Sequence, residues 1–237
     1  MRPCAILATV PSRRHLSSGR AESPFRYIGG DASLDFVNTV DWKARGTSNE
    51  RLVNYERLTR WAQEAGILTG KDAKRLRGVA RSHPRKAEAA LVYALRLRSV
   101  LQRLFRSVAA GDRQNRAWKE FNALLSAALH QLEVKPRDGA GGGEWVWRRS
   151  VERLHAMLPP VLWSAARLLA SEEAPRIRIC AGPECGWMYV DRSRNGLRRW
   201  CRMETCGTLE KSRRRRERNR ASRHSQEYRG RSVIPNG

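Results

Sequence analysis

Four cysteines in the C-terminal quarter of the chain have the residue type and the spacing of a metal site. Cys180 and Cys185 form one pair and Cys201 and Cys206 a second, with four residues inside each pair and fifteen between the pairs. Four thiolates arranged as a tetrahedron make a closed structural zinc site that has no open position for catalysis. The sequence therefore predicts one structural zinc ion bound by Cys180, Cys185, Cys201 and Cys206.

Two disulfides are the alternative explanation for the same four cysteines. Disulfide frameworks are typical of small secreted domains, whereas a chain of 237 residues can bury a core of its own. We therefore favour zinc, which can contribute about 10–16 kcal/mol of folding free energy in such a site. Because the segment around the cysteines has few apolar residues, we expect it to fold only with the metal. Cys4 is distant in sequence and is not expected to bind it.

The elements that position these cysteines are predicted to be a short β ribbon and a basic helix. Residues 187–190 and 198–200 flank Arg194-Asn195-Gly196, a hairpin signal that would bring the two pairs together. The sequence GTLEKSRRRRERNR follows Cys206 and predicts a helix with no apolar face. Such a helix is either solvated or placed against a polyanion.

Nucleic acid is the polyanion that this charge pattern favours. The residues predicted to hold phosphates are Arg198, Arg199, Lys211, Arg213, Arg214, Arg215, Arg216, Arg218 and Arg220. Double-stranded DNA is the expected partner. RNA is the alternative, since Trp187, Tyr189 or Trp200 could stack on unpaired bases if they were exposed.

At these residues the chain resembles the CGNR zinc finger. The resemblance rests on C-x4-C-G-W and on R-R-W-C-x-M-x-x-C-G, which ends at Gly207; Thr208 and Leu209 stand where the family has the Asn and Arg of its name. The run GG-x3-LDFVNT, residues 29–39, resembles the opening of the bacterial ABATE domain that usually precedes this finger. Proteins with this pairing are described as stress-induced transcription regulators. The resemblance implies a cytoplasmic bacterial regulator.

The composition agrees with a polyanion as partner. The chain has 47 Lys and Arg against 23 Asp and Glu, a net charge of +24. From Arg176 onward there are 17 basic and 6 acidic residues, against 30 and 17 before it, so the charge per residue is more than doubled in the tail. No apolar run approaches the roughly 18 residues of a membrane span. The sequence contains no nucleophile elbow, phosphate loop or paired-histidine zinc motif, so we expect that the protein is not an enzyme. The alternative is an enzyme with an unrecognised active site in the helical domain that precedes the finger.

Apolar periodicity before the finger predicts a mainly α-helical domain with a minor β-hairpin component. The expected helices are residues 31–40, 52–68, 72–81, 85–110, 112–132 and 151–170, with a hairpin formed by 131–134 and 144–147. Residues 151–170 are expected to form either a pair of helices or one helix kinked at Pro159-Pro160. A short strand is expected at 25–28. The predicted organisation is an N-terminal extension (1–22) that is disordered or outside the natural protein, a helical ABATE-like domain (23–172), a zinc-ribbon or treble-clef-like module (176–220) and a disordered tail (221–237).

A polar set at the start of the helical domain is the candidate site for a small-molecule effector. It comprises Asp35, Asn38, Thr39 and Arg45. Helix capping and loop anchoring are the commoner uses of such residues. Two hypotheses remain open at this point: a sensor domain that binds a ligand here and reorients the finger, and a purely structural domain that carries or dimerises it.

Overall fold

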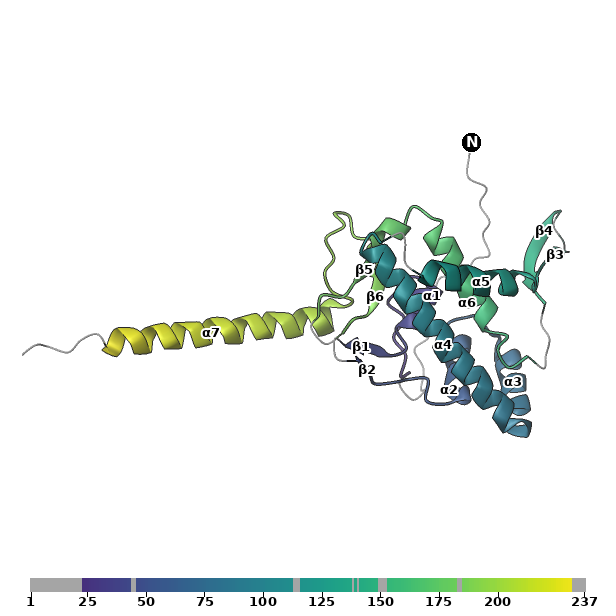
Figure 1. The fold of residues 1–237 in the computed structure, drawn as a ribbon, viewed down its shortest axis with the longest axis horizontal. Coiled ribbons are helices and arrows are strands. Elements are labelled where there is room, and N and C mark those ends of the chain that lie inside the picture. Colours follow the sequence, from purple (N-terminus) through teal and green to yellow (C-terminus); the bar gives the residue numbers. More distant parts are fainter. Residues whose placement is uncertain are drawn as a thin grey trace, which may run out of the picture.

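The computed structural model describes residues 23–43, 46–112, 116–137, 139, 141–148, 153–182 and 185–231. Its helices confirm the mainly α-helical prediction (Figure 1). They are α1 (Ala32–Val37), α2 (Tyr55–Glu64), α3 (Gly70–Ser82), α4 (Pro84–Ala109), α5 (Ala117–Leu129), α6 (Leu158–Leu169) and α7 (Thr208–Arg231), with a 3-10 turn η1 (Ala174–Arg176) and a π-turn η2 (Met203–Gly207).

Short polar caps and prolines set where the helices begin. Asn54 accepts a hydrogen bond from the Arg57 N–H and caps α2, and Thr69 caps α3 in the same way. The predicted kink at Pro159-Pro160 is wrong. These prolines lie in the first turn of α6, where the backbone N–H groups need no helical partner and the fixed φ of proline favours the helix.

The described strands pair into three separate antiparallel two-stranded sheets. They are β1 (Asp41–Lys43) with β2 (Gly46–Ser48), β3 (Leu132–Pro136) with β4 (Gly143–Trp147), and β5 (Ile177–Ile179) with β6 (Met188–Val190). The β3–β4 pair is the predicted hairpin, with Val134 opposite Trp145. Residues 25–28 form no strand, although the Gly29 carbonyl that follows accepts a hydrogen bond from the Val190 N–H.

The ribbon prediction in the zinc module is wrong about the partner of its first strand. β6 pairs with β5, which lies upstream, with Ile177 opposite Val190. Residues 198–200 form no strand. The turn between them is closed by the Asp191 carboxylate, which accepts hydrogen bonds from the N–H groups of Ser193 and Arg198, so that side-chain bonds replace a strand ladder.

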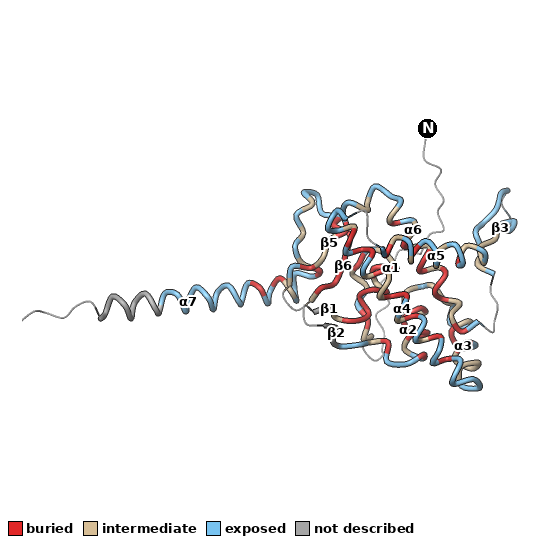
Figure 2. Tube along the Cα trace, in the orientation of Figure 1, coloured by how far each residue is buried: buried red, intermediate tan, exposed pale blue. Residues whose placement is uncertain are grey.

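The larger of two hydrophobic cores in the described residues lies around α4, which packs against α1, α2, α3, α5 and β5 (Figure 2). Its largest fully buried side chain is Trp61 of α2, whose ring centroid lies 4.9 Å from that of Phe36 in α1. Ile177, Met188 and Val190 of the finger belong to this same core. The finger and the helical domain therefore share their packing.

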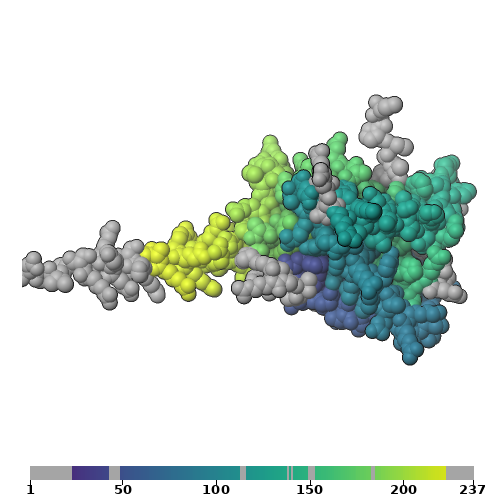
Figure 3. Space-filling model, in the orientation of Figure 1, coloured from purple at the N-terminus to yellow at the C-terminus, as the bar shows by residue number. Residues whose placement is uncertain are grey.

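Helix α7 leaves this body and projects from one end of it (Figures 1 and 3). It continues to Arg231, so residues 221–231, for which we predicted a disordered tail, are helical. The reason is that no proline interrupts this stretch, and the residues after Arg220 include good helix formers such as alanine, arginine, glutamine and glutamate. None of the helices in the described ranges is long and apolar enough to cross a membrane.

Candidate metal centre and nucleic-acid interface

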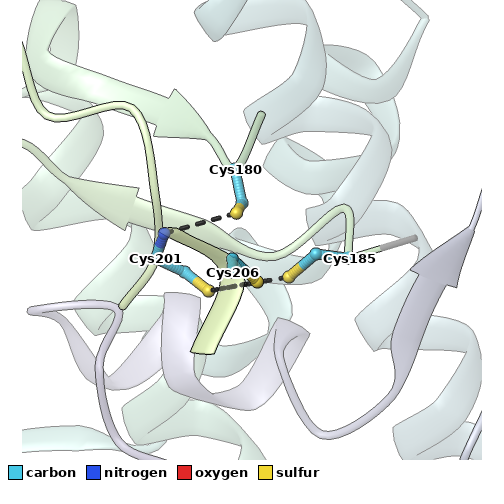
Figure 4. Close-up of side chains that lie close together, drawn as sticks. All are labelled: Cys180, Cys185, Cys201 and Cys206. Carbon is cyan, nitrogen blue, oxygen red and sulfur yellow. Dashed lines mark hydrogen bonds between the residues drawn. The ribbon is translucent and has the colours of Figure 1, made fainter. Parts of the chain in front are cut away.

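The four predicted cysteines converge from four separate segments of the zinc module (Figure 4). Cys180 directly follows β5, and Cys185 lies in the turn before β6. Cys201 follows the Asp191 turn, and Cys206 lies inside η2, which continues directly into α7. The fold therefore joins the metal site to the first residue of the basic helix.

The sulfur positions fit one tetrahedral zinc ion. All four Sγ atoms lie within 4.8 Å of one another, and Cys201 Sγ is 3.6 Å from both Cys185 Sγ and Cys206 Sγ. With zinc–sulfur bonds of about 2.3 Å, tetrahedral geometry places the sulfurs about 3.8 Å apart. A disulfide requires about 2.05 Å. All four thiols are free, so the zinc prediction is confirmed in preference to two disulfides.

Hydrogen bonds around the Cys180 sulfur favour its thiolate. The Cys180 sulfur accepts the backbone N–H groups of Gly182 at 3.4 Å and Cys201 at 3.3 Å. Hydrogen bonds from the thiols of Cys185 and Cys201, followed by these backbone groups, lower the pKa of Cys180. Its proximity raises the pKa of Cys185 and of Cys201. Four thiols this close cannot all ionise by themselves, and a divalent cation supplies the compensating charge.

The metal centre is held directly against the helical domain. The backbone N–H of Trp42 donates to the Cys185 carbonyl at 3.2 Å, and the indole N–H of Trp187 donates to the Val40 carbonyl at 3.0 Å. Gly186, between them, has a φ of +64°, and a Cβ there would lie 1.9 Å from the Trp42 carbonyl oxygen. Only glycine fits this position, because its φ is positive and the backbone of β1 is too close for a side chain.

Asn38 is the polar residue that joins the two domains. Its side-chain amide donates to the Met188 carbonyl at 2.8 Å, and its side-chain oxygen accepts the Met188 N–H at 2.9 Å. It is 1% exposed. Asn38 thus acts as an extra strand residue beside β6, which the sequence did not reveal.

The other members of the predicted effector site are also engaged within the protein. Asp35 accepts the Gly29 N–H at 2.8 Å, and the Thr39 hydroxyl donates to the Phe36 carbonyl at 2.7 Å. Arg45 lies outside the described residues. Ligand binding by Asp35, Asn38, Thr39 and Arg45 stays a prediction, and the structure gives each of the first three a different hydrogen-bond partner within the protein.

Three buried ionic groups among the described residues were missed by the sequence analysis: Arg98, Asp191 and Glu210. Arg98 of α4 is 5% exposed, donates to Thr39 at 2.8 Å and pairs with Glu50. Asp191 is 0% exposed and closes the turn described above. A signal existed for Arg98, because it lies next to Leu97 within the apolar stripe of its helix.

The predicted phosphate-binding residues fall into two groups. Every side chain from Lys211 to Ser222 is exposed on α7. Arg198 is half-buried instead: its guanidinium donates to the Trp200 and Cys201 carbonyls and lies 4.1 Å from the Tyr189 ring centroid. Arg198 therefore stabilises the loop that contains Cys201. The exposed members of the predicted set are Arg199 and the basic residues of α7.

Glu210 organises the first turns of α7. Its carboxylate accepts hydrogen bonds from Arg213 at 2.8 Å and from Arg214 at 2.9 Å, while Arg213 also reaches Glu217 at 2.5 Å. The hydrogen bonds from Arg213 and Arg214 lower the pKa of Glu210 to about 2. Glu210 is therefore ionised at neutral pH and neutralises part of the charge at the base of the helix.

Two family models match the chain. The ABATE model, described as "Putative stress-induced transcription regulator", matches residues 30–172, and the CGNR zinc finger model matches residues 176–219. No curated protein matches the chain. The two matched ranges meet next to η1, the turn that leads into β5 and the first zinc ligand.

Proposed function

Because the chain belongs to the ABATE family and ends in a CGNR zinc finger, we propose that it is a cytoplasmic transcription regulator that binds double-stranded DNA through α7. The zinc ion holds Cys206 and thereby the start of α7. The helical domain is attached to the zinc module through the hydrogen bonds of Asn38 and Trp187. The zinc centre has four cysteine ligands and no open position, which supports a binding role over a catalytic one.

The exposure of α7 is the observation that carries this proposal. From Lys211 to Ser222 no side chain is buried, so this part of the helix has no packing role in the monomer. Residues 208–222 include seven basic and two acidic residues, a net charge of +5. These charges occupy all sides of the helix. A polyanion on one or both sides is the environment that such a helix fits.

The shape of α7 favours duplex DNA over RNA. Its 24 residues extend about 36 Å, close to one turn of B-form DNA. It stands clear of the body, so the body does not block its entry into a groove (Figure 3). The major groove of B-form DNA admits an α-helix, whereas that of A-form RNA is deep and narrow.

The aromatic residues of the finger support the same choice. Tyr189 is 0% exposed and donates its hydroxyl to the Arg198 carbonyl at 2.6 Å. Trp187 is 7% exposed, and Trp200 packs on the cysteine cluster beneath Arg199. These rings stabilise the zinc loop and offer little surface for stacking on unpaired bases.

The proposal is tested by titrating the zinc-loaded full chain with labelled duplex DNA, single strands and structured RNA at several salt concentrations. If about five phosphates are neutralised, log affinity should fall with log salt with a slope near −4 to −5. Replacing Arg215, Arg216, Arg218 and Arg220 by Ala should abolish most binding. The matched control replaces Lys74, Arg75, Arg81 and Arg85, exposed cations of α3 and α4, and should bind nearly as the parent does.

Two results would contradict the proposal. Unchanged binding in the α7 variant would remove α7 as the nucleic-acid surface. Tighter binding to structured RNA than to every duplex tested would favour the RNA-binding alternative.

A further inference from the structure

A cleft of about 570 Å³ lies where the helical domain, the zinc loop and the base of α7 meet. Arg26 and Arg51 line it from the helical domain, Arg202 from the zinc loop, and Arg213 and Arg216 from α7. Small-molecule sites have volumes of about 300–1,000 Å³ and often lie between domains. The volume greatly exceeds the space that one zinc ion fills, although Cys185, Cys201 and Cys206 form part of its wall.

The charges around the cleft favour an anionic occupant. Five arginines face two carboxylates, Asp41 and Glu210. Asp41 is bound by Arg51 at 3.0 Å, and Glu210 is held by Arg213 and Arg214. A zinc ion with four thiolates carries two net negative charges. Arg202 and Arg213 also have acidic partners beyond the lining, Glu204 at 3.5 Å and Glu217 at 2.5 Å. Arg216 lines the cleft without an acidic partner among the described residues, so its guanidinium is the charge that one anionic group can approach.

The walls between these charges are apolar. Trp187 and Ile28 line the cleft, and Ile28 packs against the buried cluster that contains Trp187. Leu209 lines the cleft from α7 and is nevertheless 70% exposed. An exposed leucine at the lip of a positively charged cleft would be covered by the apolar part of a bound molecule.

We propose that this cleft binds a small amphipathic monoanion, a carboxylate or sulfonate carried on an aromatic or aliphatic body. The body covers Leu209, Ile28 and Trp187, and the anionic group lies among the arginines. We further propose that the ligand weakens DNA binding, because Arg213 and Arg216 serve both the ligand and the DNA phosphates. This second step rests on the proposed function, whereas ligand binding does not.

The shared arginines set the direction of the effect, and linkage makes it reciprocal. A ligand that lowers the affinity for DNA by some factor must itself be bound more weakly by the same factor when DNA is present. The cleft therefore assigns a sensing role to the junction of the domains. This location differs from the Asp35, Asn38, Thr39 and Arg45 set.

The probe for the test is 8-anilino-1-naphthalenesulfonate, an aromatic monoanion whose fluorescence rises in apolar surroundings. Titrated into the zinc-loaded full chain, it should bind saturably at one site per chain. N-phenyl-1-naphthylamine has the same aromatic body without the sulfonate, and it should bind at least about tenfold more weakly. Equal binding of the two would overturn the anionic part of the proposal.

Two matched variants locate the site. Leu209→Gln removes the apolar side chain at the edge of the cleft. It should weaken binding of the sulfonate probe about tenfold, as expected for a leucine that is largely covered by ligand. Leu197→Gln is the control, because Leu197 is 76% exposed in the same module and lies outside the cleft lining. Zinc content and circular dichroism confirm that both variants are folded. Equal affinity of the parent and Leu209→Gln would overturn the site.

The final measurement adds labelled duplex DNA. The probe should weaken DNA binding, and saturating DNA should weaken probe binding by the same factor. If probe binding depends on Leu209 but the probe does not change the affinity for DNA, the regulatory step is overturned and the proposed binding site still holds. Probe binding of this kind in a protein that binds no DNA would contradict the proposed function while supporting the cleft.

Discussion

Asn38 shows how one buried side chain holds two domains together. It makes two hydrogen bonds with the backbone of Met188, 150 positions further along the chain, and both lie away from solvent. A polar group that is buried without a partner costs more free energy than a made hydrogen bond contributes. Asn38 is therefore costly to replace even though its own bonds contribute little net stability.

We expect Asn38→Ala to lower the free energy of unfolding of the zinc-loaded protein by about 2–3 kcal/mol, because the N–H and carbonyl of Met188 lose their partners. Urea denaturation followed by circular dichroism measures this. Asn122→Ala, on the exposed face of α5, is the control and should change stability little. An equal loss in both variants would show that Asn38 has no special role at the interface.

His155 provides a pH dependence in the helical domain. Burial, together with the positive charge of Arg153, lowers the pKa of His155 below its ordinary value of 6.5. The unfolded chain therefore binds this proton more tightly, so stability falls as the pH drops below about 6.5 and levels off below the folded pKa. An NMR titration of the imidazole should show the lowered pKa. His155→Asn should reduce the loss of stability between pH 7.5 and 6; an identical loss in the variant would assign it to other groups.

At the scale of elements, α7 combines a fixed start with an unsupported length. Cys206 in η2 and the Glu210 contacts hold its first turns. From Lys211 to Ser222 every side chain is exposed and unpacked, and neighbouring arginines repel one another. Most helical stability in proteins comes from tertiary packing, which this stretch lacks.

We therefore expect fast amide hydrogen exchange in residues 211–222 of the free protein. Duplex DNA should slow this exchange at least about tenfold, because phosphates relieve the repulsion between the arginines. Exchange in α4 is the internal control and should be slow in both states. Strong protection of 211–222 without DNA would show that the helix is stable by itself.

At the scale of the molecule, the zinc finger is part of the body. Ile177, Met188 and Val190 are buried in the core that α4 organises, and Gly186 packs against the backbone of β1. The helical domain and the finger are therefore expected to unfold together.

Removal of zinc should destabilise both regions. We expect Cys206→Ser, or chelation of the parent, to lower the urea midpoint of the whole chain and to speed hydrogen exchange in α4. Elemental analysis of the parent should give one zinc per chain. The control is Cys4→Ser, which leaves the metal-binding set intact. A finger that unfolds while exchange in α4 remains slow would show that the two domains are energetically independent.

Short-range patterns in the sequence were sufficient for the zinc ligands and for most helices. The spacing of Cys180, Cys185, Cys201 and Cys206 and the apolar periodicity of α2 to α6 are local properties that need no knowledge of the fold. The absence of an apolar face in α7 is equally local. Only the tertiary structure decided that β6 pairs with β5, that Asn38 supports the finger and that a cleft forms beneath α7. These depend on contacts between residues far apart in sequence, where many partners have similar local preferences and the packing of the whole chain selects one.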